Sequence, residues 1–238
     1  MDNATYATLT RQSGLQQEMQ VLANNIANAS TDGFQKEGII FSEYVERMEQ
    51  ADTSLSMARA HARMVDRSQG QLTQTGGQFD FAIEGEGYFL LETPEGNRVS
   101  RAGRFFPNAE GLLAAADGAR VLDQGGAPIF VPPETQTLHV APDGTISADG
   151  APLGQIGLVM PADPNGMTRS GDVRFAIEGG TVPAEGATIA QGFIEASNVD
   201  PVLEVSRMIE VQRAYESGKA LIDGEDDRMR TIIKTLGQ

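Results

Sequence analysis

Side chains that could carry catalysis or bind a metal are few in this chain of 238 residues, which contains no cysteine. Without cysteine there is neither a disulfide framework nor thiolate chemistry. The two histidines, His61 and His139, lie far apart in the sequence and have no partners at ligand spacing, so the pattern does not indicate a zinc site. Both are better explained as surface or packing residues.

Carboxylates are the most abundant reactive groups. Residues 76–195 contain 16 acidic residues, and glycoside hydrolysis needs two carboxylates that flank the scissile bond. With so many acids, some pair would lie close together by chance. Glycosidase activity is therefore a hypothesis that no specific motif supports. The cluster at residues 223–227 lacks the glycine that an EF-hand loop needs at its sixth position. We therefore expect no catalytic residue, no metal and no cofactor.

The overall charge and hydropathy exclude several kinds of partner. The net charge of −15 disfavours nucleic acid and anionic lipid surfaces. No stretch reaches 18 consecutive apolar residues, so none is expected to span a membrane. The polar segment from Met1 to Gly14 lacks the basic and apolar regions of a secretory signal peptide, so no cleaved signal is expected.

A long amphipathic helix is predicted between Asp200 and Leu236. Apolar residues recur there at steps of three, four and seven, the heptad-like pattern of a helix with one apolar seam. Asp200 can cap free N–H groups and Pro201 suits the first helical position, so the helix should begin there. The predicted seam consists of Met208, Val211, Tyr215, Ile222, Met229, Ile232 and Leu236.

A second helix with the same spacing is predicted from Thr5 to Asn28, with its apolar positions at 15, 19, 22, 26 and 29. The two ends can pack as a coiled coil with each other or with copies of themselves. An ordinary antiparallel pair that closes one core is the simpler alternative. Asn24, Asn25 and Asn28 weaken the end of this helix unless their amides find partners. They either mark a fraying end or bond to a neighbouring chain.

The middle of the chain has a different composition. Residues 76–195 hold 20 of the 27 glycines and 10 of the 11 prolines, and they carry a net charge of −10. Short apolar segments alternate there with glycine turns, which predicts an antiparallel β unit, a sandwich or an open barrel. The expected strands are 80–83, 88–91, 98–101, 112–115, 120–122, 129–131, 137–140, 155–160, 173–177 and 188–194.

The predicted fold class is therefore α+β, with discontinuous terminal helices of coiled-coil type flanking a central antiparallel β domain. We expect the N-terminal part of a helical core domain over 1–45 and an extended connector over 46–77. An outer β domain should follow over 78–195, and the C-terminal helix of the core domain over 196–238. The connector is expected because residues 49–75 contain few large apolar side chains.

Several stretches resemble a known family. The run from Leu22 to Phe34 (LANNIANASTDGF) closely resembles the N-terminal signature of bacterial flagellar rod and hook proteins. The runs EASNV at 195–199 and MIEVQRAYE at 208–216 resemble the C-terminal signature of the same family. FAIEGEGYF at 81–89 and RAGRF at 101–105 are similar to its β-domain motifs. The signatures stand in the family's order and cover nearly the whole chain.

Within this family the size of the chain and the run Ser197–Val202 are most similar to the proximal-rod subgroup. A distal-rod or hook-type subunit is the alternative. Two positions depart from the family pattern: Ser100 stands where threonine is common, and Gly218 stands where asparagine is frequent.

The resemblance implies a structural subunit of the basal-body rod, the axial drive-shaft of flagellum-dependent motility, and no enzymatic activity. It implies terminal helices that assemble with copies of the chain and with other rod proteins, and a β domain that faces outward. It also implies export through the flagellar type III apparatus to the periplasmic rod. The assembly residues that it implies are Asn24, Asn25, Ile26, Asn28, Gly33, Phe34, Ser197, Asn198, Met208, Ile209, Gln212, Arg213 and Tyr215.

Two other classes of protein stay open at this point. An enzyme that acts where the rod crosses peptidoglycan would need a cleft with paired carboxylates. A stand-alone binding module would need terminal helices that fold back as a closed pair and do not associate with other chains.

Overall fold

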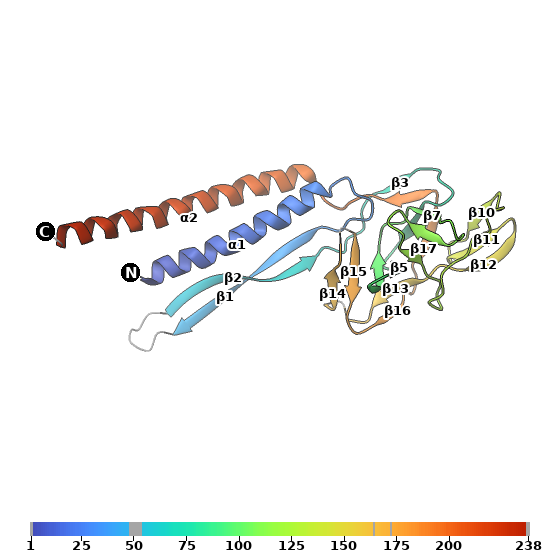
Figure 1. The fold of residues 1–238 in the computed structure, drawn as a ribbon, viewed down its shortest axis with the longest axis horizontal. Coiled ribbons are helices and arrows are strands. Elements are labelled where there is room, and N and C mark those ends of the chain that lie inside the picture. Colours follow the sequence, from blue (N-terminus) through green and yellow to red (C-terminus); the bar gives the residue numbers. More distant parts are fainter. Residues whose placement is uncertain (1, 48–53, 164, 172, 237–238) are drawn as a thin grey trace. The chain divides into compact units, whose positions relative to one another are not determined.

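The computed structural model describes residues 2–47, 54–163, 165–171 and 173–236, and the chain forms two compact units. The helical unit combines the N-terminal segment up to Ala27 with Lys36–Asp66 and the C-terminal segment from Asp200 (Figure 1). The β unit combines Asn28–Gln35 with Arg67–Val199. Both units are therefore built from segments that are distant in the sequence.

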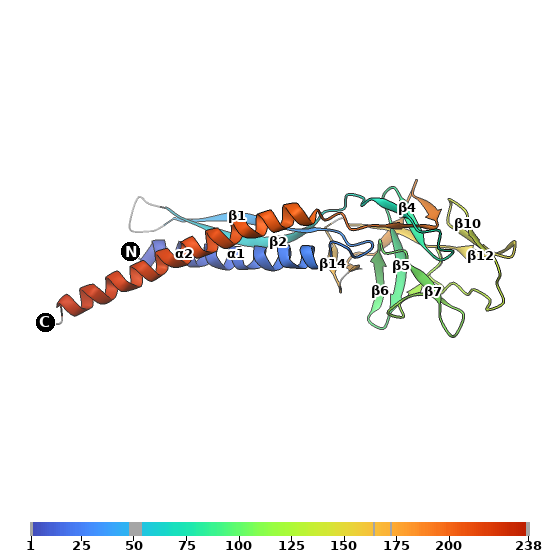
Figure 2. The ribbon, with the colours of Figure 1, turned by 90° about the horizontal axis from the view of Figure 1, so that it is seen from above.

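The described residues of the helical unit form two helices and one hairpin. Its elements are α1 (Asp2–Ala27), β1 (Glu37–Arg47), β2 (Ser54–Val65) and α2 (Pro201–Leu236). The two helices lie side by side and run in opposite directions (Figures 1 and 2), and α1 also contacts the hairpin. The α1–α2 contact confirms that the two ends of the chain can pack on each other, here as an antiparallel pair within one subunit.

The strand β2 lies where the sequence suggested an extended connector over 46–77. Ser54–Val65 instead pairs with β1 in antiparallel register, with a bulge at Ile40 and Phe41. The hairpin is closed at its base by Asp66, whose backbone N–H donates to the Lys36 carbonyl at 2.8 Å. Backbone groups can satisfy a strand pair whatever the side chains are, so a scarcity of large apolar residues does not prevent pairing. Residues 48–53 of the expected connector lie outside the described part.

The start of α2 is capped as the sequence predicted. The Asp200 carboxylate accepts hydrogen bonds from the backbone N–H groups of Val202 at 2.9 Å and Leu203 at 3.1 Å. These are two of the free donors at a helix N-terminus. Within the seam, Val211 is buried while Met229 and Ile232 are exposed. The seam is therefore covered near the start of α2 and uncovered near its end.

Two polar contacts fix how α1 and α2 are aligned. Arg207 on α2 forms an ion pair with Glu18 on α1, with an Nη2–Oε1 distance of 3.0 Å. Further along, the Gln12 amide donates to the Tyr215 carbonyl at 2.8 Å. Gly218 leaves room for this amide, because a Cβ atom at position 218 would collide with Gln12 Nε2. The glycine that departs from the family pattern thus permits a close helix contact.

Asn25 joins three elements of the helical unit. Its side chain is completely buried. The Asn25 amide N donates to the Glu37 carbonyl at 2.8 Å and to Glu204 Oε2 at 3.0 Å, and its oxygen accepts from the Glu37 N–H at 3.0 Å. The other Glu204 oxygen lies 2.5 Å from Lys36 Nζ. One amide thereby links α1 to the start of β1 and to the first turn of α2.

The β unit contains the remaining strands. They are β3 (Leu72–Gln74), β4 (Phe81–Glu84), β5 (Tyr88–Thr93), β6 (Gly96–Ser100), β7 (Phe105–Pro107), β8 (Leu113–Ala115), β9 (Arg120–Val121), β10 (Leu138–Val140), β11 (Thr145–Ala148), β12 (Ala151–Gln155), β13 (Leu158–Pro161), β14 (Met167–Arg169), β15 (Arg174–Ile177), β16 (Thr181–Pro183), β17 (Thr188–Gln191) and β18 (Phe193–Glu195). Their pairings among the described residues are antiparallel, as the sequence predicted.

The largest sheet of the β unit is open. Its main path runs β14-β15-β6-β5-β9-β8-β7, and β13 branches from β5 to carry β16. The path does not return to its first strand, so the described strands of this sheet do not form a closed barrel. Three aromatic rings form the centre of the core: the Phe89 and Phe105 rings lie 5.3 Å apart, and the Phe81 and Phe105 rings 6.1 Å apart. Together the two units give the α+β fold that the sequence predicted.

A buried ion pair lies beside this core. Arg101 Nη1 is 3.1 Å from Glu195 Oε2, and both side chains are almost completely buried. Arg101 also donates to the Gly85 carbonyl at 2.7 Å, while Glu195 accepts from the Gly70 N–H at 3.0 Å. Burial raises the pKa of the Glu195 carboxyl, and the Arg101 guanidinium opposes that rise. The pair holds β18 against the segment that follows β6.

We expect Asn25→Ala to lower the free energy of unfolding of the helical unit by about 2–4 kcal/mol, because the substitution leaves buried groups of Glu37 and Glu204 without partners. Thermal unfolding followed by far-ultraviolet circular dichroism measures this, since both described helices belong to this unit. Gln20→Ala, which removes an exposed amide from the same helix, is the control. Unchanged melting of Asn25→Ala together with loss of assembly would instead assign this amide to a contact between chains.

We expect Arg101→Met to destabilise the β unit by about 3–5 kcal/mol near neutral pH, because the buried Glu195 carboxylate loses its partner. Its pKa, already raised by burial, should then rise further. A carboxyl with a raised folded-state pKa destabilises the fold when it is ionised, and this penalty disappears as the pH falls through that pKa. Calorimetry should therefore show a deficit that shrinks on acidification. A deficit that does not change with pH, or that grows as the pH falls, would contradict this account.

Candidate assembly interface

The residues that the family resemblance implied for assembly fall in both units. Asn24, Asn25 and Ile26 lie on α1, and Met208, Ile209, Gln212, Arg213 and Tyr215 lie on α2. The other five, Asn28, Gly33, Phe34, Ser197 and Asn198, belong to the β unit. The described structure therefore does not gather them into one site, and each group has to be considered separately.

Within the α1 group, Asn25 is the residue that is buried inside the helical unit. Asn24 and Ile26 are half-buried, and Asn25 has its amide occupied by Glu37 and Glu204. We expected these asparagines to bond to a neighbouring chain or to mark a fraying end. For Asn25 the geometry gives a third arrangement, in which the amide acts inside the subunit. The sequence carried no signal of this, because its partners lie 12 and 179 residues away.

The N-terminal members of the β-unit group form a tight turn. Asn28 accepts hydrogen bonds from the backbone and hydroxyl of Thr31, at 3.1 Å each. Gly33 adopts a φ of +67°, and a Cβ atom there would collide with the backbone of Ala102. The Gly33 N–H donates to the Glu195 carbonyl at 2.7 Å. Glycine is required here because of both the left-handed conformation and the close approach.

Phe34, Ser197 and Asn198 complete this part of the β unit. Phe34 is buried, and the Arg169 guanidinium lies 4.5 Å from the centre of its ring. Its carbonyl accepts from the Asn198 N–H at 3.3 Å, and the Asn198 amide donates to the Ser68 carbonyl at 3.0 Å. The Ser197 hydroxyl accepts from the Val199 N–H at 3.3 Å. These residues therefore join three chain segments within the β unit.

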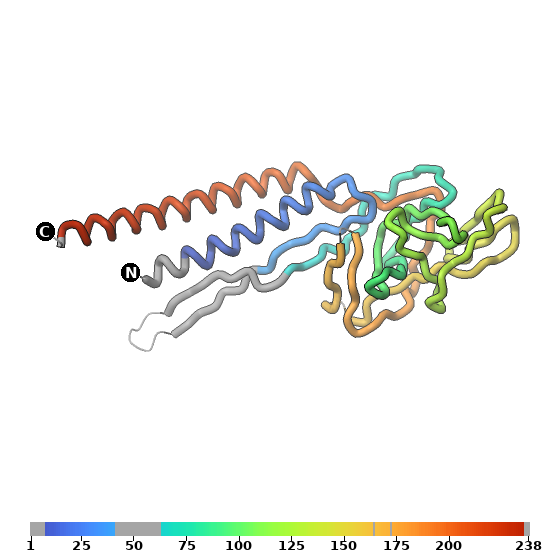
Figure 3. The backbone as a smooth tube through the Cα atoms, viewed as in Figure 1, coloured from blue at the N-terminus to red at the C-terminus, as the bar shows by residue number. Residues whose placement is uncertain are grey.

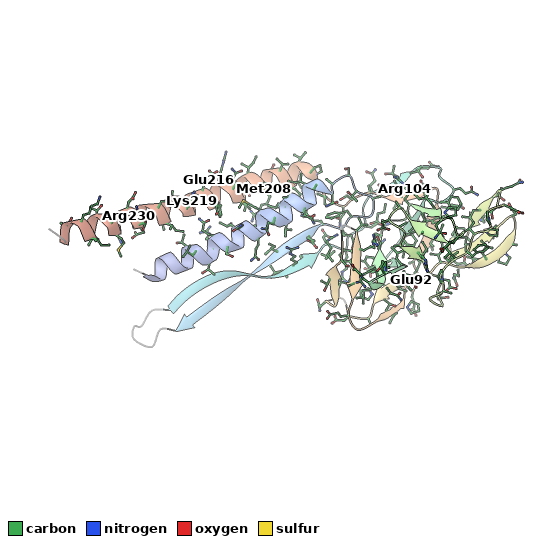
Figure 4. The ribbon with its side chains drawn as sticks, viewed as in Figure 1. Glu92, Arg104, Met208, Glu216, Lys219 and Arg230 are labelled. Carbon is green, nitrogen blue, oxygen red and sulfur yellow. The ribbon has the colours of Figure 1, made fainter. Side chains whose placement is uncertain are left out.

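The outward face of α2 differs from the other groups because its side chains are accessible. Ile209 is 46% exposed, and Gln212 and Arg213 are exposed as well. Gln212 donates to Glu216 one turn later, whereas Arg213 forms no ion pair among the residues that the structure describes. Met208 and Tyr215 are half-buried, and they lie three residues before and four residues after the buried Val211, on the same side of the helix. Figure 4 locates Met208, Glu216, Lys219 and Arg230 along this helix.

Apolar residues before Ile209 extend this face and were not among the predicted site residues. Val202 is 72% exposed and Val205 is 45% exposed. Val202 and Val205 lie three residues apart, and Ile209 follows four residues later, so the three side chains share one face. Val202 stands nine residues before the buried Val211, which is half a turn out of phase at about 100° per residue. The spacing of these three residues is visible in the sequence. The seam from Met208 to Leu236 is longer, however, and gives the stronger periodic pattern.

The described residues show little that would support catalysis. No group of three His, Cys, Asp or Glu side chains within the described ranges could hold a metal ion. A cavity of about 470 Å³ in the β unit is lined by one carboxylate, Glu86, together with Arg67, Arg101 and Tyr88. Glycoside hydrolysis needs two carboxylates, but this cavity is lined by only one. None of the described helices is both long enough and apolar enough to cross a membrane.

Comparisons with known proteins cover the chain from end to end. Residues 6–35 match the model of the flagella basal body rod protein family, and residues 190–235 match that of the flagellar basal body rod FlgEFG protein C-terminal. Between them, residues 82–148 match the flagellar hook protein FlgE/F/G D1 domain. The matched segments include parts of both helices and much of the β unit.

Curated relatives agree with these matches. The chain is 40% identical to the flagellar basal-body rod protein FlgF of Caulobacter vibrioides, a comparison that covers 100% of this chain and 99% of the relative. It is 37% identical to FlgF of Mesorhizobium japonicum over the same shares, and 30% identical to FlgG of Bacillus subtilis over 98% of each chain. The chain therefore belongs to the family of flagellar basal-body rod proteins, the structural subunits of the rod, and among them it is FlgF-like.

Proposed function

We propose that this chain builds the proximal part of the rod and that the outward face of α2 is its principal assembly surface. The exposure of this face is the observation that carries the proposal. Val202, Val205 and Ile209 present branched apolar side chains to solvent on a helix whose opposite side already packs against α1. Burial of such side chains between subunits stabilises an assembly by about 1.5–3 kcal/mol each, before ordering costs.

Polar residues on the same helix would give this surface its specificity. Arg213 presents five N–H donors in a planar fork, which suits carboxylates and carbonyls of a neighbouring chain. Gln212 adds an amide next to it. We assign Met208 and Tyr215 to the α1–α2 contact that supports this face, and Asn24 and Ile26 to packing beneath it. Asn25 fixes α2 in place from inside the subunit.

The residues of the β-unit group have a supporting role in this proposal. Gly33, Phe34, Ser197 and Asn198 hold together the segments of the β unit that precede and follow the helical segments in the sequence. Asn28 forms the turn before them. Their substitution should act through the fold of the β unit, and only indirectly through contacts between subunits.

The remaining properties follow from the proposed role. The chain would assemble with copies of itself and with other rod proteins in the periplasmic part of the basal body. It would reach this place through the flagellar type III export apparatus. It would act as a structural element without catalysis, and its net charge of −15 disfavours nucleic acid as a partner.

We expect Ile209→Asp to abolish rod assembly and motility while leaving the unfolding of the purified chain nearly unchanged. An exposed site tolerates such a change within about 0.5 kcal/mol, whereas a charge placed in an apolar contact between subunits must be desolvated. Motility in soft agar and the presence of the chain in isolated basal bodies measure the effect. Arg213→Ala should weaken assembly in the same direction.

The matched control is Val182→Asp on β16. Val182 is 45% exposed, nearly the same as the 46% of Ile209, but it lies in the β unit. This variant should assemble and swim normally. Normal motility of Ile209→Asp, or equal loss of motility in both variants, would show that the outward face of α2 is not the principal assembly surface.

A further inference from the structure

The cavity of about 470 Å³ in the β unit has no part in the assembly surface proposed on α2. Its volume lies within the range of about 300–1,000 Å³ that is usual for small-ligand sites. The lining comes from segments that are distant in the sequence, and the path of the chain through the β unit can be followed in Figure 3. It includes Arg67, Glu86, Tyr88, Arg101 and Met160.

Tyr88 and Arg101 form a fixed part of this lining. The Tyr88 hydroxyl donates to Gln35 Oε1 at 3.0 Å, and its ring lies edge-on to Phe175 with the ring centres 6.2 Å apart. The Arg101 guanidinium lies 5.4 Å from the centre of the Tyr88 ring and is held by the buried Glu195 carboxylate. Because partners inside the β unit already hold both side chains, a ligand can bind against them without first ordering them.

Two other lining residues carry opposite charges and are not paired. Arg67 and Glu86 are exposed, and neither forms an ion pair within the part of the chain that the structure describes. Their charged atoms are therefore more than 4.0 Å apart, although both residues line one cavity. The cavity thus offers a cation and an anion that do not neutralise each other directly.

The positive end of the cavity lies beside Tyr88. Burial raises the pKa of the Tyr88 hydroxyl, and the hydrogen bond to Gln35 and the charges of Arg101 and Arg67 oppose that rise. Both guanidinium groups therefore act on the same phenol oxygen. Arg101 also has a buried Nε–H without a hydrogen-bond partner among the described residues. Guanidinium groups are the preferred donors to carboxylates, so this end suits a carboxylate.

We propose that this cavity binds a zwitterion of the amino-acid type, with its carboxylate beside Arg67 and Arg101 and its ammonium group beside Glu86. A simple anion would be repelled by Glu86, and a simple cation by the two arginines, whereas a zwitterion gives each charge a partner. Met160 adds an apolar, adaptable contact for the carbon atoms of the ligand. A free amino acid and a short peptide with free ends share this chemistry. The site is independent of the assembly surface on α2.

Calorimetric titration of the purified full chain with L-alanyl-L-alanine tests this site. Two derivatives of this dipeptide each lack one charge: the N-acetylated form has no ammonium group, and the C-terminal amide has no carboxylate. We expect the dipeptide to bind at least about tenfold more tightly than either derivative, because each derivative loses a charge-assisted hydrogen bond. Free L-alanine is titrated alongside. Tighter binding of the dipeptide than of alanine would identify a peptide ligand, and the reverse order an amino acid.

Two substitutions test which residue binds which end of the ligand. In Arg67→Gln, the dipeptide and its amide should bind about equally, because the partner of the carboxylate is lost. In Glu86→Gln, the dipeptide and its N-acetylated form should bind about equally for the corresponding reason. Arg120→Gln and Glu134→Gln are the matched controls, since each removes an exposed charge of the same sign from the β unit outside this cavity. They should leave the affinities unchanged.

Several results would overturn this proposal. A cavity that holds only water would bind none of the four compounds at millimolar concentration. Equal affinity for all four, or affinities that Arg67→Gln and Glu86→Gln leave unchanged, would show that these charges do not recognise the ligand. None of these measurements involves incorporation into basal bodies. Failure of the ligand site would therefore leave the proposed assembly function intact, and failure of assembly in Ile209→Asp would leave the ligand site intact.

Discussion

The hydrogen bonds of one buried amide, that of Asn25, hold the helical unit together. Each buried group left without a partner in this place would cost about 1–3 kcal/mol, so the arrangement is favoured only when every bond is made. Its partners are backbone groups at the start of β1 and a carboxylate in the first turn of α2. Glu204 is itself neutralised by Lys36, which is why a carboxylate can be buried at this point. The outward face of α2 is therefore presented from a fixed base.

The β unit also contains buried polar groups that link distant segments of the chain, in this case an ion pair. Arg101 and Glu195 come from distant parts of the sequence, and each satisfies backbone groups as well as its partner. A buried ion pair adds little net stability compared with apolar residues of the same volume, but it strongly penalises arrangements in which one partner is absent. It thus selects one path for the chain past the core of the β unit. The apolar core, centred on Phe81, Phe89 and Phe105, supplies the stability.

Local features of the sequence predicted the local features of the structure. The Asp200 cap, both helices and ten of the 18 described strands follow from periodicity and turn residues, which depend on neighbours in the chain, whereas the expected strand 129–131 is not a strand in the structure. The segment 188–194 was expected as one strand, yet Gly192, with a φ of +79°, divides it into β17 and β18. Contacts between residues that are distant in the sequence produce no local pattern from which they could be predicted. The roles of Asn25, Gln12 and β2 depend on partners that only the folded chain brings near.

The contact between Gln12 and the Tyr215 carbonyl, together with the Arg207–Glu18 ion pair, sets how far α2 extends beyond α1. The apolar pattern of a heptad seam repeats every seven residues. Two such helices could therefore slide past each other by seven residues, about 10 Å, and still pack apolar side chains against apolar side chains. Such a shift would move Gln12 away from the space beside Gly218, and its amide would lose the hydrogen bond to the Tyr215 carbonyl. The polar contact therefore removes the alternative alignments. Since this alignment sets the protruding length, the number of turns of α2 that extend beyond α1 depends on positions 12 and 218, far from those turns.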